Sequence, residues 1–159
     1  MVRIQLETFI NAPIERVFDL SRSIDLHQLS TSATREKAIA GRTTGLIELN
    51  ETVTWRARHL GVYQKLSVTI PQMDRPYSFT DRMLKGAFAA MRHEHLFAAE
   101  GHATRMTDIL EFAAPLGPLG RLAEVLLLQR YMTRFLLTRN QTIQSVAEGE
   151  DWRRFIPEN

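Results

Sequence analysis

Two histidines separated by a single residue, His93 and His95, have the spacing in this chain that most suggests chemistry. Residues 88–99 alternate between apolar and polar side chains, as do residues 104–113, which predicts two strands joined by a tight turn near Gly101. Residues i and i+2 of a strand point to the same face, so both imidazoles share one side of the sheet. The turn sets His95 opposite Asp108, Phe97 opposite Met106 and Met91 opposite Phe112.

An imidazole beside a carboxylate can serve three purposes, and the residues alone leave all three open. Asp108 would hold His95 in one tautomer and favour its protonated form, because a nearby negative charge stabilises the imidazolium. Such a pair could act as a general acid and base in an enolisation, a dehydration or an aldol cyclisation. It could instead orient a hydroxyl or carbonyl group of a bound molecule, or form a buried hydrogen bond that fixes the strand register.

The same histidine pair is typical of metal sites in jelly-roll enzymes, where two ligands project from one strand. Glu100 follows at a spacing compatible with that motif. The second half of the motif is missing, because Ala123 stands where a histidine is needed and no histidine follows His102. His59, on another predicted strand, could complete a site with Asp108 as the carboxylate. We predict no metal and no other cofactor.

Composition excludes several other chemistries. The chain has 159 residues, 44% of them hydrophobic, and its 20 basic and 18 acidic side chains leave a net charge of +2. The absence of cysteine removes disulfides, thiol nucleophiles and cysteine-ligated metals. Neither a Gly-x-Ser-x-Gly elbow nor a phosphate-binding glycine loop occurs. The balanced charge argues against nucleic-acid binding, and no apolar run reaches the roughly 18 residues of a membrane span. We expect one cytoplasmic domain, a monomer or homodimer without integral membrane association.

The candidate functional residues lie within a predicted succession of strands that ends in a helix. Residues 2–10 form the first strand, Asn11 offers a cap to a short helix beginning after Pro13, and a second short helix covers 24–29. Further strands are predicted at 36–41, 44–50, 51–59, 62–70, 77–84, 88–99 and 104–113. Residues 71–76 connect two of them. A helix from about 118 to 148 ends at Gly149, with a solvated face formed by Arg121, Arg130, Arg134 and Arg139.

This order of elements predicts an α+β fold in which a curved antiparallel sheet of about seven strands is covered on its apolar face by the terminal helix. A curved sheet leaves space beneath such a helix, and apolar pockets with a few polar groups are typical ligand sites. The side chains expected to line this cavity are Trp55, His59, Phe79, Met91, His93, His95, Phe97, Met106, Asp108, Phe112, Met132 and Phe135.

Several segments resemble one known superfamily. The opening IQLETFINAPIERVFDLSRSIDLH, the strand TVTWRARHLG, the hairpin segments RHEHLF and TRMTDILEF, and the closing PLGPLGRLAE are similar to the SRPBCC, or START-like, superfamily. That superfamily includes the birch-pollen-allergen and polyketide cyclase/dehydrase types. The resemblance implies a helix-grip fold with a hydrophobic cavity between the sheet and the terminal helix. We expect one START-like ligand-binding domain over residues 1–149. The acidic and aromatic tail over 150–159 is expected to be loosely packed, as chain ends commonly are.

The resemblance and the placement of the histidines together suggest two functions. The first is binding or transport of a small hydrophobic molecule, such as a lipid, polyketide or isoprenoid, with His93, His95 and Asp108 supplying polar recognition. The alternative is an aromatase/cyclase- or dehydratase-like enzyme that uses His95 and Asp108 as acid and base.

Overall fold

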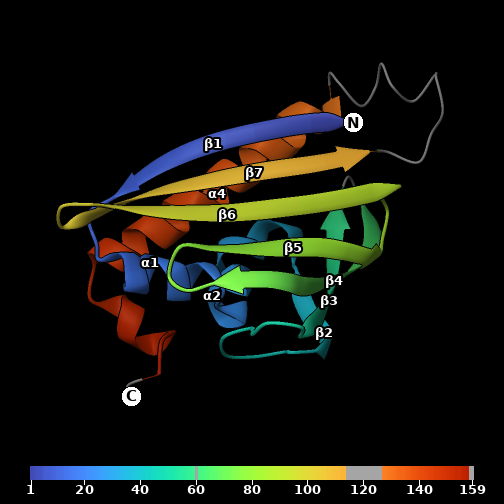
Figure 1. The fold of residues 1–159 in the computed structure, drawn as a ribbon. Helices are drawn as coiled ribbons and strands as arrows, with labels where there is room; N and C mark the ends of the chain where they lie inside the picture. The colour runs from blue at the N-terminus through green and yellow to red at the C-terminus, as the bar shows by residue number, and fades with distance from the viewer. Residues whose placement is uncertain (60, 114–126, 158–159) are drawn as a thin grey trace.

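The computed structural model describes residues 1–59, 61–113 and 127–157. Its framework is a seven-stranded antiparallel sheet in the order β1-β7-β6-β5-β4-β3-β2 (Figure 1). The strands alternate buried and exposed positions, as a sheet with one covered face requires. Their bounds are β1 Val2–Ile10, β2 Lys37–Gly41, β3 Thr52–His59, β4 Val62–Asp74, β5 Ser78–Lys85, β6 Ala90–Glu100 and β7 Ala103–Ala113.

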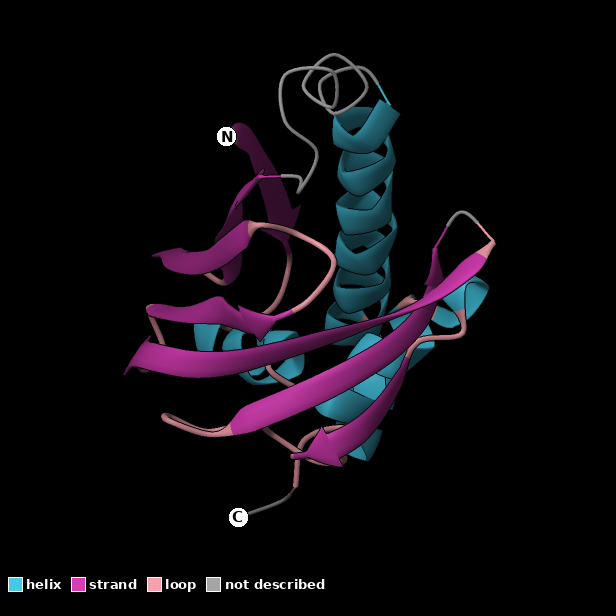
Figure 2. Cartoon of the chain, turned by 90° about the vertical axis from the view of Figure 1, so that its right-hand side faces the viewer, coloured by secondary structure: helices cyan, strands magenta, loops and turns pink. Residues whose placement is uncertain are grey.

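Helices occupy the inner side of this sheet. The α-helices are α1 Ile14–Ser21, α2 Ile24–Ser30 and α4 Gln129–Glu148, and the short 3₁₀ turns are η1 Ser32–Thr34 and η3 Asp151–Arg154. The strands curve around α4, which runs along the inside of the sheet (Figure 2). The fold is therefore the predicted helix-grip arrangement, with two short helices after the first strand. Among the helices of the described residues, none combines the length and apolar character needed to cross a bilayer.

Both predicted hairpin registers are confirmed. In the β3–β4 pair Trp55 lies opposite Leu66, and in the β6–β7 pair His95 lies opposite Asp108. A shift by one residue would move every side chain to the other face, so burial of one face fixes the register. The two histidines therefore point inward together.

Three local predictions differ from the structure. Residues 44–50 form no strand, only an isolated bridge between Ser23 and Leu46, because the Asp25 carboxylate accepts the backbone N–H of Gly45 at 2.8 Å and holds a turn there. β4 continues through Pro71, where a register irregularity accommodates the missing N–H. Asn11 does not cap α1, and no side-chain bond caps that helix.

Only one of the two predicted ends of the last helix can be compared with the structure. α4 ends at Glu148 before Gly149, as predicted. The predicted start near residue 118, like the predicted helical positions up to residue 126, lies outside the described residues.

The tail that the sequence suggested to be loosely packed makes definite contacts. Its Trp152, Phe155 and Ile156 pack against the larger core cluster, which is built mainly from α1, α2 and the sheet. The guanidinium of Arg16 lies 4.3 Å from the Trp152 ring centroid. The chain after α4 thus returns to the helical layer.

Candidate functional site

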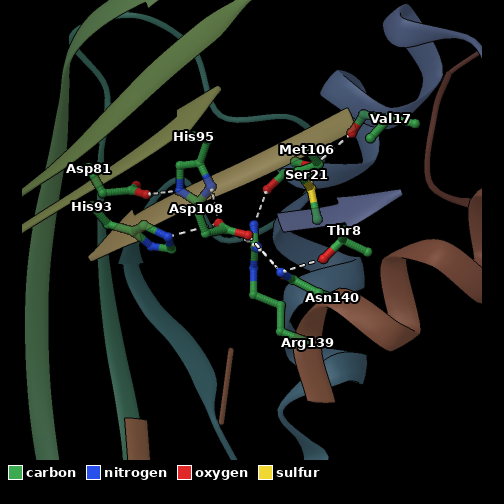
Figure 3. Close-up of polar contacts among 10 residues, drawn as sticks. All are labelled: Thr8, Val17, Ser21, Asp81, His93, His95, Met106, Asp108, Arg139 and Asn140. Carbon is green, nitrogen blue, oxygen red and sulfur yellow. Dashed lines mark hydrogen bonds and ion pairs between the residues drawn. The ribbon is translucent and has the colours of Figure 1, made fainter. Parts of the chain in front are cut away.

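A fully buried carboxylate, Asp108 on β7, lies at the centre of the polar groups between the sheet and α4 (Figure 3). Its Oδ1 accepts a hydrogen bond of 2.8 Å from His93 Nε2, and its Oδ2 accepts one of 2.7 Å from Asn140 Nδ2. Arg139 Nη1 lies 3.4 Å from Oδ1. Strand β7 and helix α4 are therefore joined by one buried anion.

His95 lies between two carboxylates. Its Nε2 donates to Asp81 Oδ2 at 2.7 Å, and its Nδ1 lies 3.0 Å from Asp108 Oδ1. The second contact is an ion pair without hydrogen-bond geometry, so Nδ1 has no hydrogen-bond partner. Phe79 stacks on the imidazole at 4.2 Å between ring centroids, and His93 lies 3.9 Å away on the other side. Both ring faces of His95 are thus covered, which fixes its orientation.

The two neighbouring imidazoles have opposite protonation preferences. Burial and the adjacent His95 lower the pKa of His93 to about 4, against the opposing effect of Asp108. Burial also disfavours charge on His95, but the contacts with Asp108 and Asp81 outweigh it and raise its pKa. At neutral pH His93 is therefore a neutral ring, whereas His95 favours its protonated form more than a free imidazole does.

The carboxylates of this cluster are ionised. Burial opposes ionisation of Asp108, but His93, His95 and Arg139 outweigh it and hold the pKa well below its usual value. Burial also opposes ionisation of Asp81, but the hydrogen bond and charge of His95, together with His93 and Arg139, outweigh it and lower the pKa of Asp81. Two carboxylates thus face the Arg139 cation and an imidazole, His95, that favours its protonated form.

Local sequence explains how these groups meet. Alternation along β6 places His93 and His95 on the inner face, and the register with β5 sets Asp81 opposite His93. Arg139 and Asn140 are adjacent on α4 and both buried. Arg139 also donates to the Ser21 carbonyl at 3.1 Å, so the cluster connects α1, α4 and the sheet.

Two pockets lie between the sheet and α4 beside this cluster. The first has a free volume of about 110 Å³ and includes Asp81, His93 and His95 in its wall. The second has about 180 Å³ and includes His59 and Tyr131. They share a wall, so they form neighbouring parts of one crevice. The shared side chains are Glu36, Trp55, Leu66, Met91, Met132 and Phe135.

The structure divides the predicted cavity residues into two groups. Eight lie on the pocket walls, namely Trp55, His59, Phe79, Met91, His93, His95, Met132 and Phe135. Phe97, Met106, Asp108 and Phe112 lie behind those walls, in the core. The reason is coverage by neighbours: Phe18 packs edge-on against Phe97 at 5.4 Å, and Ser21 Oγ lies 3.4 Å from the sulfur of Met106.

His59 does not join the other two histidines. Its Nδ1 lies 2.6 Å from the hydroxyl oxygen of Tyr131, in the second pocket. Burial lowers the pKa of His59. The carboxylate that completes the histidine cluster is Asp81, which the sequence analysis did not select.

Other residues of the site were not predicted from the sequence either. Arg139, expected on a solvated face, is 4% exposed, whereas Arg130 and Arg134 are exposed as predicted. Glu36, expected only as part of a short strand, is buried at the wall common to both pockets. A signal for Arg139 existed, since it falls on the apolar stripe between Leu136 and Ile143.

Within the described residues, one group has the composition of a metal site. Asp81, His93 and His95 bring ligand atoms within 4.8 Å of one another. Two histidines and a carboxylate suit several divalent metals. His95 Nε2 is already hydrogen-bonded to Asp81 and His93 Nε2 to Asp108, so these two nitrogens have partners within the polar network.

No protein-family model matches the sequence, and no curated protein matches it significantly. Solved structures do resemble it. The Zhui aromatase/cyclase from Streptomyces sp. R1128 aligns with a TM-score of 0.73 at 12% identity, over 96% of this chain and 94% of that one. The protein TTHA0849 from Thermus thermophilus has a TM-score of 0.72 at 17% identity, over 92% and 99%.

A START superfamily protein from Mycobacterium smegmatis aligns with a TM-score of 0.69 at 8% identity, covering 92% of this chain and 97% of that one. At such low sequence identities, these alignments show a shared fold and nothing about function. The strand order, the gripped helix and these alignments agree with one another. The chain therefore has the helix-grip fold of the START-like, or SRPBCC, superfamily.

Proposed function

We propose that the protein binds a small hydrophobic molecule in the crevice between the sheet and α4. The observation that carries this proposal is the shared wall of the two pockets, in which Trp55, Leu66 and Phe135 present mainly apolar surface beneath the helix. Concave apolar surfaces with a few polar groups are the usual form of small-molecule sites. The similarity to an aromatase/cyclase and to a START superfamily protein supports the same role by analogy of fold.

The crevice favours a slender or flexible ligand. With free volumes of about 110 and 180 Å³, neither pocket alone holds an intact lipid, but a chain could occupy both. Asp81 and His95 offer polar contacts at one end. A lipid, polyketide or isoprenoid-like molecule with an oxygen at that end satisfies this arrangement.

The test is binding of the neutral fluorescent probe N-phenyl-1-naphthylamine to the purified protein. Met91 lies in the wall of both pockets, so Met91→Trp should fill the crevice and weaken binding at least about tenfold, the equivalent of about 1.4 kcal/mol. Leu96→Trp is the matched control, because Leu96 lies on the same strand and is 39% exposed. Absence of probe binding, or equal affinity in the two variants, would argue against the proposal.

A second candidate function is acid–base catalysis at the first pocket. It is favoured by one observation: two adjacent imidazoles on the pocket wall have pKa values driven apart, which is how enzymes separate a base from an acid. Neutral His93 would accept a proton from the carbon next to a carbonyl, and the His95 imidazolium would donate to the carbonyl oxygen.

This activity is measured as hydrogen–deuterium exchange next to the carbonyl of a hydrophobic 1,3-diketone. The protein should accelerate exchange over buffer, and His95→Gln should abolish the acceleration while affinity for the neutral probe stays within about twofold. A graded loss of affinity without any exchange activity would assign His95 to binding alone.

A further inference from the structure

Glu36 is a buried carboxylate at the wall that the two pockets share. It lies just before β2, and its side chain is only 6% exposed. Buried acidic groups normally occur with a cationic or hydrogen-bonding partner, because loss of hydration is costly. The partners of Glu36 therefore decide what its carboxylate does.

The protein provides Glu36 with an incomplete partner. Within the described residues, its one ion pair is with His27, whose Nε2 lies 3.3 Å from Glu36 Oε2 and is charged only when protonated. That oxygen is buried and accepts no hydrogen bond. Burial alone would raise the pKa of Glu36, but His27, with smaller effects of His59 and Thr31, outweighs burial and lowers it, so the group is an anion at neutral pH.

Other cations near the crevice are already engaged or directed elsewhere. Arg22 pairs with Asp19 and Glu48, and Arg139 pairs with Asp108. Lys65, in the wall of the second pocket, is exposed, and no ion pair joins it to Glu36. Apart from His27, no side chain of the described residues forms an ion pair with Glu36.

Aromatic rings surround the same region. Trp55 and Phe135 lie in the wall that contains Glu36, and Tyr131 lies in the wall of the second pocket. The His27 ring lies against Trp55 at 4.3 Å between centroids, with the ring planes tilted by 33°. Aromatic faces attract organic cations through the ring quadrupole, and a carboxylate adds a direct charge contact.

We infer that the crevice selects ligands that carry a cationic amine on an apolar body, with the ammonium group against Glu36 and the aromatic wall. This inference rests on the proposed binding function and specifies its ligand class. A neutral alcohol could donate one hydrogen bond to Oε2 but would leave the buried charge uncompensated. A carboxylate ligand would be repelled by Glu36.

The test compares three ligands of equal chain length: octylamine, octanol and octanoate. Each displaces N-phenyl-1-naphthylamine from the protein at pH 7, where octylamine is a cation and octanoate an anion. Octylamine should bind at least about tenfold more tightly than octanol, and octanoate should bind most weakly. Equal affinities of octylamine and octanol would overturn the inference while leaving the binding function intact. Failure of the neutral probe to bind would refute the binding function and this inference together.

Substitution identifies the responsible group. Glu36→Gln keeps the side-chain shape and should bring octylamine to the affinity of octanol, with octanol changed by less than about threefold. Glu7→Gln, which removes an exposed carboxylate on β1, is the matched control and should preserve the wild-type ranking. A Glu36→Gln variant that folds, as judged by circular dichroism, and still prefers octylamine would overturn the assignment. If that variant does not fold, the wild-type ranking of the three ligands decides.

Discussion

Asparagine in place of Asp108 preserves the shape of the side chain and removes the negative charge on which the buried cluster depends. Within the described residues, Arg139, 4% exposed, would then face neutral acceptors in place of the carboxylate, among them the Ser21 carbonyl and the Asn140 side-chain oxygen, each at 3.1 Å. His95 would lose one of its two anionic neighbours. Removing one partner of a buried pair leaves an uncompensated charge and costs about 3–5 kcal/mol. We expect Asp108→Asn to lower the free energy of unfolding by that amount.

Urea denaturation followed by circular dichroism at pH 7 measures this loss. The transition midpoint should fall with little change in the denaturant slope, and the melting temperature should drop by roughly 6–20 °C for a chain of this length. Glu111→Gln is the matched control, because Glu111 pairs with Arg3 at 3.9 Å on the surface. That variant should lose no more than about 1 kcal/mol.

A second substitution separates lost charge balance from lost hydrogen bonds. Arg139→Met in the Asp108→Asn background removes the uncompensated cation, so the double variant should be more stable than the sum of the two single losses predicts. A loss below about 1 kcal/mol for Asp108→Asn would refute the reasoning. Strict additivity of the two changes would refute it equally, since the two groups would then not interact.

Three further outcomes follow from individual residues. Because the pKa of His93 is about 4, against about 6.5 in an unfolded chain, stability should be lost as pH falls from about 6.5 to 4. In urea titrations at several pH values, the His93→Gln variant should lose about 3 kcal/mol less unfolding free energy over this range than the wild-type protein. Equal losses in the two proteins would contradict this expectation. Gly41→Ala would place a Cβ atom 2.2 Å from the Thr52 carbonyl oxygen, whereas Gly101→Ala meets nothing within 4 Å. Both glycines have positive φ, so Gly101→Ala should lower the free energy of unfolding by about 1 kcal/mol, and Gly41→Ala should lower it by clearly more. Equal losses in the two variants would show that the clash at Gly41 does not affect stability. Met106→Ala, at a fully buried position, should lower the unfolding free energy by about 2–5 kcal/mol, and a loss under about 1 kcal/mol would place that side chain outside the packed core.

The sequence was sufficient for the strands whose pattern and pairing reinforced each other. The β6–β7 register rests on apolar pairs such as Phe97 with Met106 and on the opposite charges of Arg92 and Glu111, all of which occur in the structure. The false strand at 44–50 had no such partner segment. This segment is held instead by the side chain of Asp25 on α2. The apolar and polar alternation of residues 44–50 contains no information about that contact.

The site was harder to predict because strand and helix periodicity assign faces but not partners. Asp81 shares a face with Phe79 on β5, yet its role depends on β6 lying beside it in one particular register. Arg139 follows Phe135 and precedes Ile143 by helical steps of four, so periodicity placed it on the buried stripe. Arginine is usually exposed, and this general tendency led to the wrong prediction for Arg139. The anion that compensates its charge, Asp108, lies on a strand distant in the sequence.

The two buried acidic groups differ in how their charges are balanced, and that difference assigns them separate roles. Around Asp108 the protein supplies the Arg139 cation, two imidazoles and the Asn140 amide, so that cluster is complete without any other molecule and fixes α4 against the sheet. Around Glu36 one imidazole forms the only ion pair within the described residues, and one carboxylate oxygen remains without a hydrogen bond at the junction of the pockets. A group balanced within the protein favours rigidity, whereas one balanced only in part favours recognition. Changes at Asp108 should therefore alter stability before specificity, and changes at Glu36 should alter specificity before stability.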